Sequence, residues 1–274
     1  MQLNNKTVFI TGGSRGIGAA IALKLAASGA NVAIAAKSVV EDPRLGGTIY
    51  SVTEAIEKAG GKALPIQCDI RDEAAILDAV EKTAATFNGI DILINNASAI
   101  YLSPTEMLSA KQFDLMHDIN IRGTFLVGKA CLPYLKKSQA GHILTLSPPI
   151  NLNPKWLGKH AAYTIAKYGM TMLALGWAEE LEGYNVASNT LWPKTTIDTA
   201  AVRNLLGGET LAHKSRTPDI MADAALAILS KENKAYNGQT LIDEAVLRNE
   251  GISDFSKYSV IPGAALYTDL FLDE

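Results

Sequence analysis

Two side chains that could carry chemistry, Tyr163 and Lys167, stand four residues apart in the segment Ala-Ala-Tyr-Thr-Ile-Ala-Lys. Residues four apart lie on the same face of a helix, so the phenol and the ammonium can point into one site. A free tyrosine has a pKa of about 10 and is a poor acid or base at neutral pH. A cation held close to the phenol favours the phenolate and lowers that pKa. The spacing therefore predicts a general acid/base.

A glycine-rich segment upstream, Thr11-Gly-Gly-Ser-Arg-Gly-Ile-Gly18, could hold a phosphorylated cofactor beside this acid/base. Gly12, Gly16 and Gly18 follow the first strand-like run and open a helical pattern over residues 17–28. Glycines in that position let the backbone approach a pyrophosphate, whose charge the helix N-terminus favours. The motif alone is weak, because many tight turns use glycine for positive φ. Together with the Tyr–Lys pair it predicts an oxidoreductase.

Strand-like and helix-like segments alternate along the chain and must position these residues. The strand-like runs cover residues 7–10, 31–36, 63–68, 90–95, 142–146, 186–191 and 239–242. The helical patterns cover residues 17–28, 48–59, 72–87, 110–137, 161–181 and 220–230. Short apolar strands separated by helices imply a parallel sheet with helices on both faces. Since no repeat or linker interrupts residues 1–274, we expect one α/β domain with a Rossmann-type, doubly wound sheet of about seven strands.

The composition excludes several classes of protein. With 274 residues, 48% of them hydrophobic, and a net charge of -3, the chain can bury a large core and lacks the basic field of a nucleic-acid binder. No apolar run approaches the roughly 20 residues that span a membrane, and the N-terminus lacks the apolar core of a signal peptide. Cys68 and Cys131 indicate buried thiols in a reducing compartment. We expect a soluble, cytoplasmic protein without a metal site.

The corner after the second strand-like run indicates which nicotinamide cofactor binds. An acid there would bind the ribose hydroxyls and repel a 2′-phosphate, but the chain reads Ala35-Ala-Lys-Ser38. Lys37 and Arg15 are cations that suit a phosphate monoester, although a basic residue at a strand end can also be merely solvated. This favours NADP(H) over NAD. Asp69, after the third run, could accept from the adenine amino group or cap a turn.

These motifs, in this order, resemble the classical short-chain dehydrogenase/reductase family over essentially the whole chain. The matching pieces are the glycine-rich turn, Asp69, Asn95-Asn96-Ala97, Asn120, and Tyr163 with Lys167. The resemblance implies that Tyr163 exchanges a proton with the substrate oxygen and that Lys167 binds the nicotinamide ribose. It further implies that Asn120 holds a water of the proton relay. The predicted cofactor contacts are Gly12, Ser14, Arg15, Gly16, Ile17, Gly18, Lys37, Asp69, Ile70, Asn96, Ala97, Ser98, Tyr163, Lys167 and Pro193.

The chain departs from the family pattern at three positions near the predicted site, of which Ser98, in place of a glycine after Asn95-Asn-Ala97, has little predictive weight. A serine that binds the substrate oxygen usually ends the fifth strand, but Pro148 occupies that position and Ser147 precedes it. Adjacent strand residues face opposite sides, so Ser147 reaches the site only if the chain bulges, which the long stretch before Tyr163 allows. The Pro-Gly expected after the sixth strand reads Pro193-Lys194. Lys194 either attracts an acidic group or faces solvent.

The segment 195–215 occupies the family's substrate-lid position, and the tail from about residue 250 folds back or reaches a partner subunit. The lid mixes Ala, Leu, Val and Gly with few charges, which favours a lipophilic substrate. We expect an NADP(H)-dependent enzyme that interconverts a small-molecule carbonyl and a secondary alcohol. The alternative is an NADP(H)-binding sensor or scaffold with weak or lost catalysis, which Pro148 and Lys194 would favour. The family also implies a homodimer or homotetramer, although the apolar stripes of the helices around 105–135 and 161–181 could equally be core.

Overall fold

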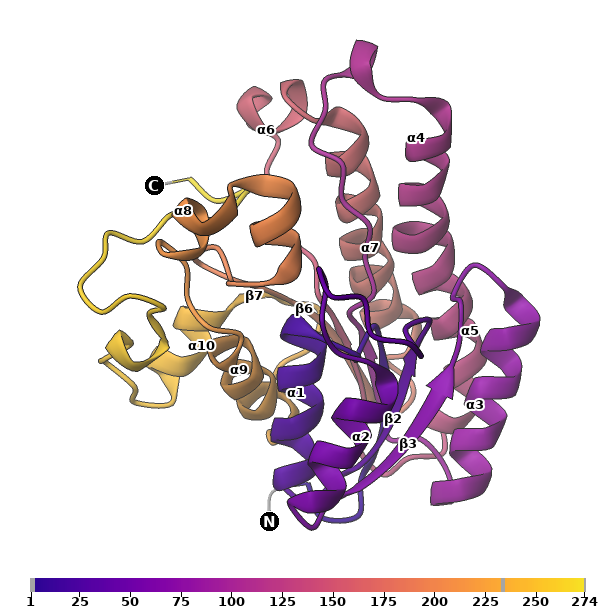
Figure 1. The fold of residues 1–274 in the computed structure, drawn as a ribbon. Coiled ribbons are helices and arrows are strands. Elements are labelled where there is room, and N and C mark those ends of the chain that lie inside the picture. Colours follow the sequence, from indigo (N-terminus) through magenta and orange to yellow (C-terminus); the bar gives the residue numbers. More distant parts are fainter. Residues whose placement is uncertain (1–2, 233–234, 274) are drawn as a thin grey trace.

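The structure, a computed structural model, describes residues 3–232 and 235–273. Within these ranges it forms a seven-stranded parallel sheet in the order β3-β2-β1-β4-β5-β6-β7 (Figure 1). The strands are β1 Thr7–Thr11, β2 Asn31–Ala36, β3 Lys62–Gln67, β4 Ile92–Asn95, β5 Gly141–Thr145, β6 Val186–Trp192 and β7 Thr240–Ile242. The chain winds outward from β1 to β3, then crosses back to place β4 beside β1. The predicted single doubly wound α/β domain is confirmed, and its switch point lies between β1 and β4.

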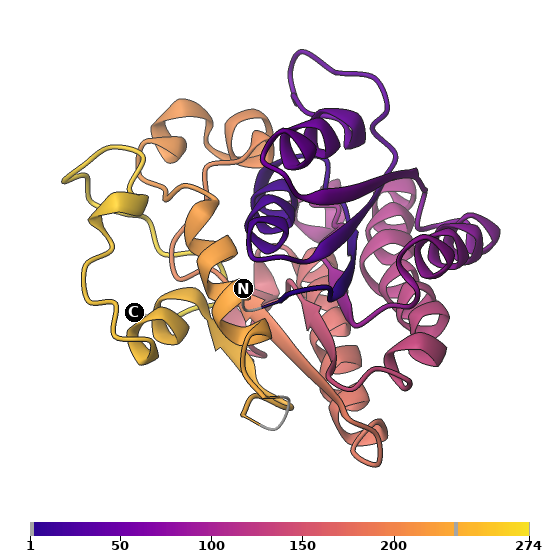
Figure 2. The ribbon, with the colours of Figure 1, turned by 90° about the horizontal axis from the view of Figure 1, so that it is seen from below.

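Helices cover both faces of the sheet, as the view from below shows (Figure 2). One face carries α1 Gly16–Ala27, α2 Ile49–Lys58, α9 Asp219–Leu229 and α10 Asp243–Asn249. The other carries α3 Glu73–Phe87, α5 Thr124–Leu135 and α7 Ala161–Glu180, and α4 Ala110–His117 packs against α7. Side chains alternate along β1, so Val8 and Ile10 enter the first core while Phe9 enters the second. This explains why the strands read as continuous apolar runs.

The predicted helical stretch 110–137 is divided into two helices. A π-helical turn, Asp118–Gly123, lies between α4 and α5 and contains Asn120. A Cβ on Gly123 would lie 2.8 Å from the Ile70 side chain, so this turn packs closely on the loop after β3. The apolar spacing of the sequence does not distinguish such a turn from regular helix, because one extra residue per turn leaves the buried stripe nearly continuous.

Short elements that the sequence did not predict lie in the second half of the chain. The helix α6, Pro154–Gly158, begins with Asn153 as its N-cap and proline at its first position. The expected lid segment contains a π-helical turn, Val202–Leu206, and α8, Gly208–Ala212. The tail folds back onto the domain, where Phe271 is only 1% exposed. Elements of about five residues are too short to show a helical period.

Candidate active site

A cleft of about 550 Å³ opens at the carboxyl ends of β1 and β4, where the direction of winding changes. A parallel sheet binds its ligands at this position. The cleft is lined by twelve of the predicted cofactor residues: Gly12, Ser14, Arg15, Gly16, Ile17, Gly18, Lys37, Asp69, Ile70, Asn96, Ala97 and Ser98. The sequence did not single out other lining residues, among them Ser38, Leu45, Thr199, Ala200 and Leu205. These residues lie in loops or in a short helical turn, which carry no periodic signal.

The glycine turn leaves its backbone open toward this cleft. Gly12 and Gly16 have φ values of +66° and +55°, which glycine adopts without strain. The Asn96 side-chain amide donates to the carbonyls of Thr11 and Gly12, each at 3.0 Å, and so fixes the turn. Arg15 occupies the N-cap of α1 without a capping side-chain hydrogen bond. The free amides of this helix end are suited to an anion, so the turn fits the pyrophosphate of a dinucleotide.

Cations outnumber carboxylates at the β2 end of the cleft. The Lys37 ammonium lies 3.6 Å from an Asp69 carboxylate oxygen, and Arg71 binds the same carboxylate at 2.6 Å. The hydrogen bond from Arg71 holds the pKa of Asp69 at about 2. A guanidinium nitrogen of Arg15 donates to the Ser38 hydroxyl at 2.7 Å. Of these charged groups Arg15, Lys37 and Asp69 line the cleft, and the two cations against one carboxylate leave a positive field beside a hydroxyl, which suits a phosphate monoester.

Two surface segments close over the cleft. The Arg15 guanidinium donates to the carbonyls of Gly46 and Gly47, and thereby holds the loop 38–48 against the glycine turn. Gly47 has a φ of +66°, and a Cβ there would lie 2.4 Å from the Ser14 carbonyl oxygen. From the expected lid, the Asn204 amide donates to the Arg44 carbonyl at 2.8 Å. Loop and lid are therefore in contact, and each also lines the cleft, through Leu45 and Leu205.

Tyr163 and Lys167 share one face of α7, as their spacing predicts, and both are buried. The Lys167 ammonium donates to the Leu146 carbonyl at 2.6 Å and lies 5.1 Å from the centre of the Trp192 ring. Burial lowers the pKa of Lys167 to about 7. Burial, together with the nearby Asp269 carboxylate, raises the pKa of Tyr163. In this closed arrangement the desolvation of the Tyr163 phenol raises its pKa by more than the neighbouring Lys167 ammonium would lower it.

The side chains of Asn120 and Ser147 have other hydrogen-bond partners than the resemblance implies. Both groups of the Asn120 amide pair with the Ala99 backbone, which accepts from Nδ2 at 3.0 Å and donates to Oδ1 at 2.8 Å. Asn120 thus holds the loop that follows β4. The Ser147 hydroxyl accepts from Thr171 at 3.0 Å, two helical turns beyond Tyr163 on α7. Among the described residues neither side chain hydrogen-bonds the Tyr163 hydroxyl, and the Ser147 hydroxyl faces Thr171, as the period of the strand predicts.

The segment after β6 and the chain end meet beside the Tyr–Lys pair. Pro193 is buried, and the Lys194 backbone accepts from the Asp269 amide at 3.1 Å. The Lys194 amide donates to the Asp243 carboxylate at 2.8 Å. The Phe271 ring stacks on Tyr163 with 6.1 Å between ring centres. The sequence shows an aromatic-rich tail but not where its rings are buried, because 108 residues separate this pair.

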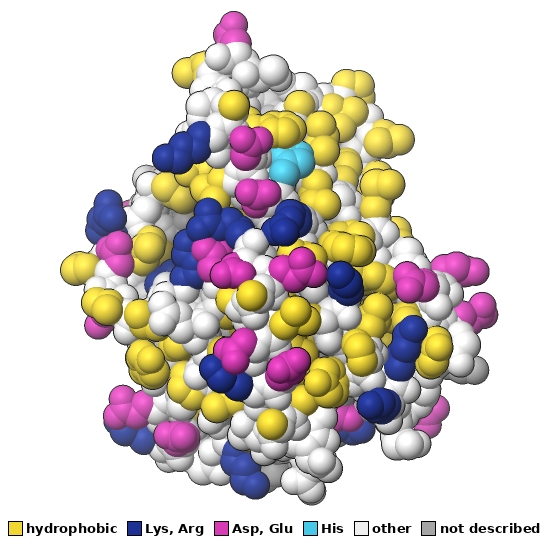
Figure 3. Space-filling model, turned by 90° about the vertical axis from the view of Figure 1, so that its right-hand side faces the viewer, with side chains coloured by type: hydrophobic (Ala, Val, Ile, Leu, Met, Phe, Trp, Pro, Cys, Tyr) yellow, Lys and Arg dark blue, Asp and Glu magenta, His cyan; other side chains and the backbone are white. Residues whose placement is uncertain are grey.

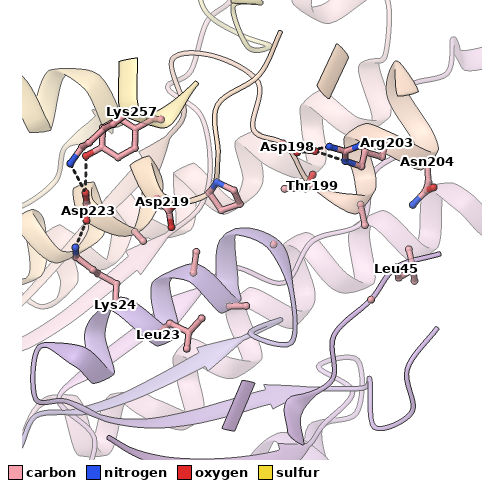
Figure 4. A pocket seen from close by; sticks show the side chains of 18 of the residues that line it. Leu23, Lys24, Leu45, Asp198, Thr199, Arg203, Asn204, Asp219, Asp223 and Lys257 are labelled. Carbon is pink, nitrogen blue, oxygen red and sulfur yellow. Dashed lines mark hydrogen bonds and ion pairs between the residues drawn. The ribbon is translucent and has the colours of Figure 1, made fainter. Parts of the chain in front are cut away.

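A second hollow of about 1000 Å³ lies between α1, α9 and the lid (Figure 4). Its charged side chains face one another: Asp223 pairs with Lys24 and Lys257, and Asp198 pairs with Arg203. Each of these two carboxylates is therefore matched by at least one cation. In the described ranges no three His, Cys, Asp or Glu side chains gather as a metal site would need. The described helices are also too short or too polar to cross a membrane.

Known proteins resemble the chain in sequence and structure. The sequence profile of the short chain dehydrogenase family matches residues 6–209. Hydroxysteroid dehydrogenase-like protein 2 of Xenopus tropicalis is 59% identical over 273 residues, and the chain spans 65% of its length. A short chain dehydrogenase of Mycobacterium thermoresistibile superimposes with a TM-score of 0.93 at 54% identity, covering 99% of this chain and 96% of that one. A metagenomic short-chain oxidoreductase in complex with NADP has a TM-score of 0.73 at 27% identity, covering 88% and 98%.

Proposed function

The chain belongs to the short-chain dehydrogenase/reductase family, and we propose that it is an NADP(H)-dependent oxidoreductase that interconverts a lipophilic carbonyl compound and a secondary alcohol. The observation that carries the proposal is the placement of Tyr163 and Lys167 on one face of α7, beside the carboxyl end of the sheet. A binding module would not need an acid/base there. The largely uncharged lid favours a lipophilic substrate.

The residues of the chain would orient the reactants and manage the proton. The nicotinamide, when bound, supplies or accepts the hydride. The Tyr163 hydroxyl would exchange a proton with the substrate oxygen. Lys167 would bind the nicotinamide ribose and stabilise negative charge on the phenol. Asn120, by holding Ala99, would keep the wall of the cleft in place.

The preference for NADP(H) is supported by Arg15, Lys37 and Ser38 at the β2 corner. The related metagenomic enzyme was crystallised with NADP. Fluorescence titration with NADPH and NADH, on wild type beside Lys37→Ala, tests this preference. The Lys37 side chain is 60% exposed, and the Asp69 carboxylate partly neutralises its charge, so its contribution to binding should be modest. In Lys37→Ala we therefore expect the affinity for NADPH to fall about 3–10-fold and the affinity for NADH to stay constant. Equal losses for both nucleotides would count against a 2′-phosphate site.

The catalytic role is tested with Tyr163→Phe. The variant lacks only the hydroxyl, so NADPH binding should persist while turnover of a validated substrate falls about 10²–10⁴-fold. Retained turnover would exclude Tyr163 as the proton donor. This measurement is independent of the cofactor preference.

A second candidate function is an NADP(H)-binding sensor or scaffold. The Ser147 hydroxyl faces Thr171, and Phe271 covers Tyr163, so the closed site lacks a serine aimed at the substrate position. Normal NADPH binding without turnover across broad carbonyl and alcohol panels would favour this function. Turnover that depends on Tyr163 would exclude it.

We also propose a homodimer or homotetramer assembled through the α4–α5–α7 side. Hydrophobic side chains gather in the upper part of this side (Figure 3). Exposed members include Phe113, Phe125, Ile165 and Met172. Analytical ultracentrifugation tests the assembly.

For localisation we propose the cytoplasm, supported by the buried free thiols of Cys68 and Cys131.

A further inference from the structure

The end of the chain fills a box of aromatic rings above the proposed acid/base. The Phe271 side chain is 1% exposed. Five rings surround it, with centres 5.3–6.1 Å away: Trp156, His160, Tyr163, Tyr168 and Trp192. The Tyr163 ring is the nearest to parallel, at 29°. The box is therefore built to hold a flat apolar ring against Tyr163.

Leu270 and Leu272 pack against the same apolar cluster as Phe271, and the tail also makes polar contacts at the surface. The Asp273 carboxylate accepts from Asn151 at 2.8 Å and from the Trp156 indole at 3.3 Å. It also pairs with Lys155 at 2.7 Å, and the two side chains of that pair are about half exposed, at 50% and 47%. Exposed pairs of this kind contribute little. Asn151, Lys155 and Trp156 all belong to the long stretch between β5 and α7, so this stretch and the tail form one latch.

The backbone at the box is strained. Phe271 has a φ of +70°, in the left-handed region that large side chains disfavour. Two hydrogen bonds hold the residues just before it: the Trp192 indole donates to the Leu270 carbonyl, and the Asp269 amide donates to Lys194. Residues 261–267 upstream are largely exposed. Release of the tail would remove the strain and would need only local movement.

The tail blocks the group that the proposed reaction uses. Tyr163 is 4% exposed and does not line the cofactor cleft. The Phe271 ring occupies the space beside the phenol that a substrate must reach. The Asp269 carboxylate, on the same segment, adds negative charge that opposes a phenolate. The segment 269–273 therefore forms part of the cover over Tyr163.

We propose that the aromatic box is a substrate subsite for a flat, apolar ring adjoining the reacting carbonyl or alcohol carbon, and that Phe271 occupies it in the absence of substrate. The proposal rests on the proposed function and narrows its substrate class. A ring of at least the size of the Phe271 side chain would stack on Tyr163 and displace the tail. Open-chain aliphatic ketones would bind the subsite more weakly, because they cannot stack between the rings.

The test uses 2-acetonaphthone as a ring-bearing ketone and 2-heptanone as an aliphatic one, with binding measured by calorimetry on cofactor-free protein. Asp273→Ala removes the exposed contacts of the tail with Asn151, Lys155 and Trp156 and keeps all five rings of the box. We expect it to tighten 2-acetonaphthone binding about fivefold. Asp254→Ala is the matched control: an exposed acid with only local hydrogen bonds to Ser256, which should leave the affinity unchanged. In every variant 2-heptanone should bind at least about tenfold more weakly.

A second measurement follows the tail of the wild type. If 2-acetonaphthone displaces it, chymotrypsin should cleave after Tyr267 and Phe271 at least about fivefold faster at saturating ketone. Cleavage that is unchanged or slower, or equal 2-acetonaphthone affinity in wild type and Asp273→Ala, would overturn the proposal. Neither readout needs NADPH or turnover, so failure of the subsite is distinguishable from failure of the proposed oxidoreductase.

Discussion

Gly18 offers a sharp test of how the cofactor turn is built. A Cβ at this position would lie 2.4 Å from the Asn96 amide nitrogen and 2.5 Å from the Gly12 carbonyl oxygen, against an ordinary contact of 3.4–4 Å. Neither atom can retreat freely, because that amide nitrogen donates to the carbonyls of Thr11 and Gly12. In Gly18→Ala either the hydrogen-bonded amide or the turn itself must move.

The size of the effect follows from these contacts. Overpacking costs about 1–3 kcal/mol, and one lost hydrogen bond adds about 1 kcal/mol. The expected destabilisation of about 2–4 kcal/mol is smaller than the stability of a typical domain, so the variant should still fold. In a domain of this size each kcal/mol shifts the Tm by about 2 °C, so the Tm should fall by about 4–8 °C. A displaced α1 N-terminus would also lose a charged hydrogen bond to the pyrophosphate, which weakens NADPH binding about 10–100-fold.

Thermal unfolding by circular dichroism and NADPH titration measure the two effects of Gly18→Ala. Gly183→Ala is the control, because a Cβ at Gly183 meets no atom within 4 Å. It should change neither quantity. Wild-type NADPH affinity and an unchanged Tm in Gly18→Ala would refute the argument that close backbone approach requires glycine at this position.

Three further predictions concern buried groups and helix packing. Burial lowers the pKa of Lys167 from 10.5 to about 7, so between these pH values the unfolded chain binds more protons than the folded one. The free energy of unfolding should therefore rise with pH in this window. Urea unfolding at pH 7 and 9 measures the rise, which Lys167→Met should remove. Burial lowers the pKa of His142 from 6.5 to about 4, so the free energy of unfolding should fall as the pH drops through that window. If His142→Gln lost as much stability as the wild type over the same pH range, this prediction would be wrong. Gly128→Ala would place a Cβ 2.5 Å from the Trp177 ring and should cost about 1–3 kcal/mol in urea unfolding. Gly176→Ala is the control, because its Cβ would meet no atom within 4 Å, and its free energy of unfolding should rise by about 0.5–1 kcal/mol. A Gly128→Ala variant as stable as the wild type would show that α5 and α7 can separate.

The sequence alone determined the features that depend on local periodicity and on short motifs. Apolar runs separated by helical patterns were sufficient for the doubly wound sheet, because each strand and helix buries a face set by its own spacing. The glycine turn and the Tyr163–Lys167 pair could also be predicted, since four residues along a helix determine a shared face. Where the spacing is nearly unchanged, as at the π-helical turn around Asn120, the sequence predicted a continuous helix.

Only the tertiary structure decided which distant groups meet. Nothing in the local pattern indicates that Asn120 pairs with Ala99, or that Ser147 faces Thr171. The tail shows this most clearly, because Phe271 stacks on Tyr163 from 108 residues away and places Asp269 near Lys167. Such contacts depend on how the whole chain packs, and packing also sets the desolvation that shifts the pKa of each buried group. The sequence therefore determined the Tyr163–Lys167 pair, and the fold decided what covers it.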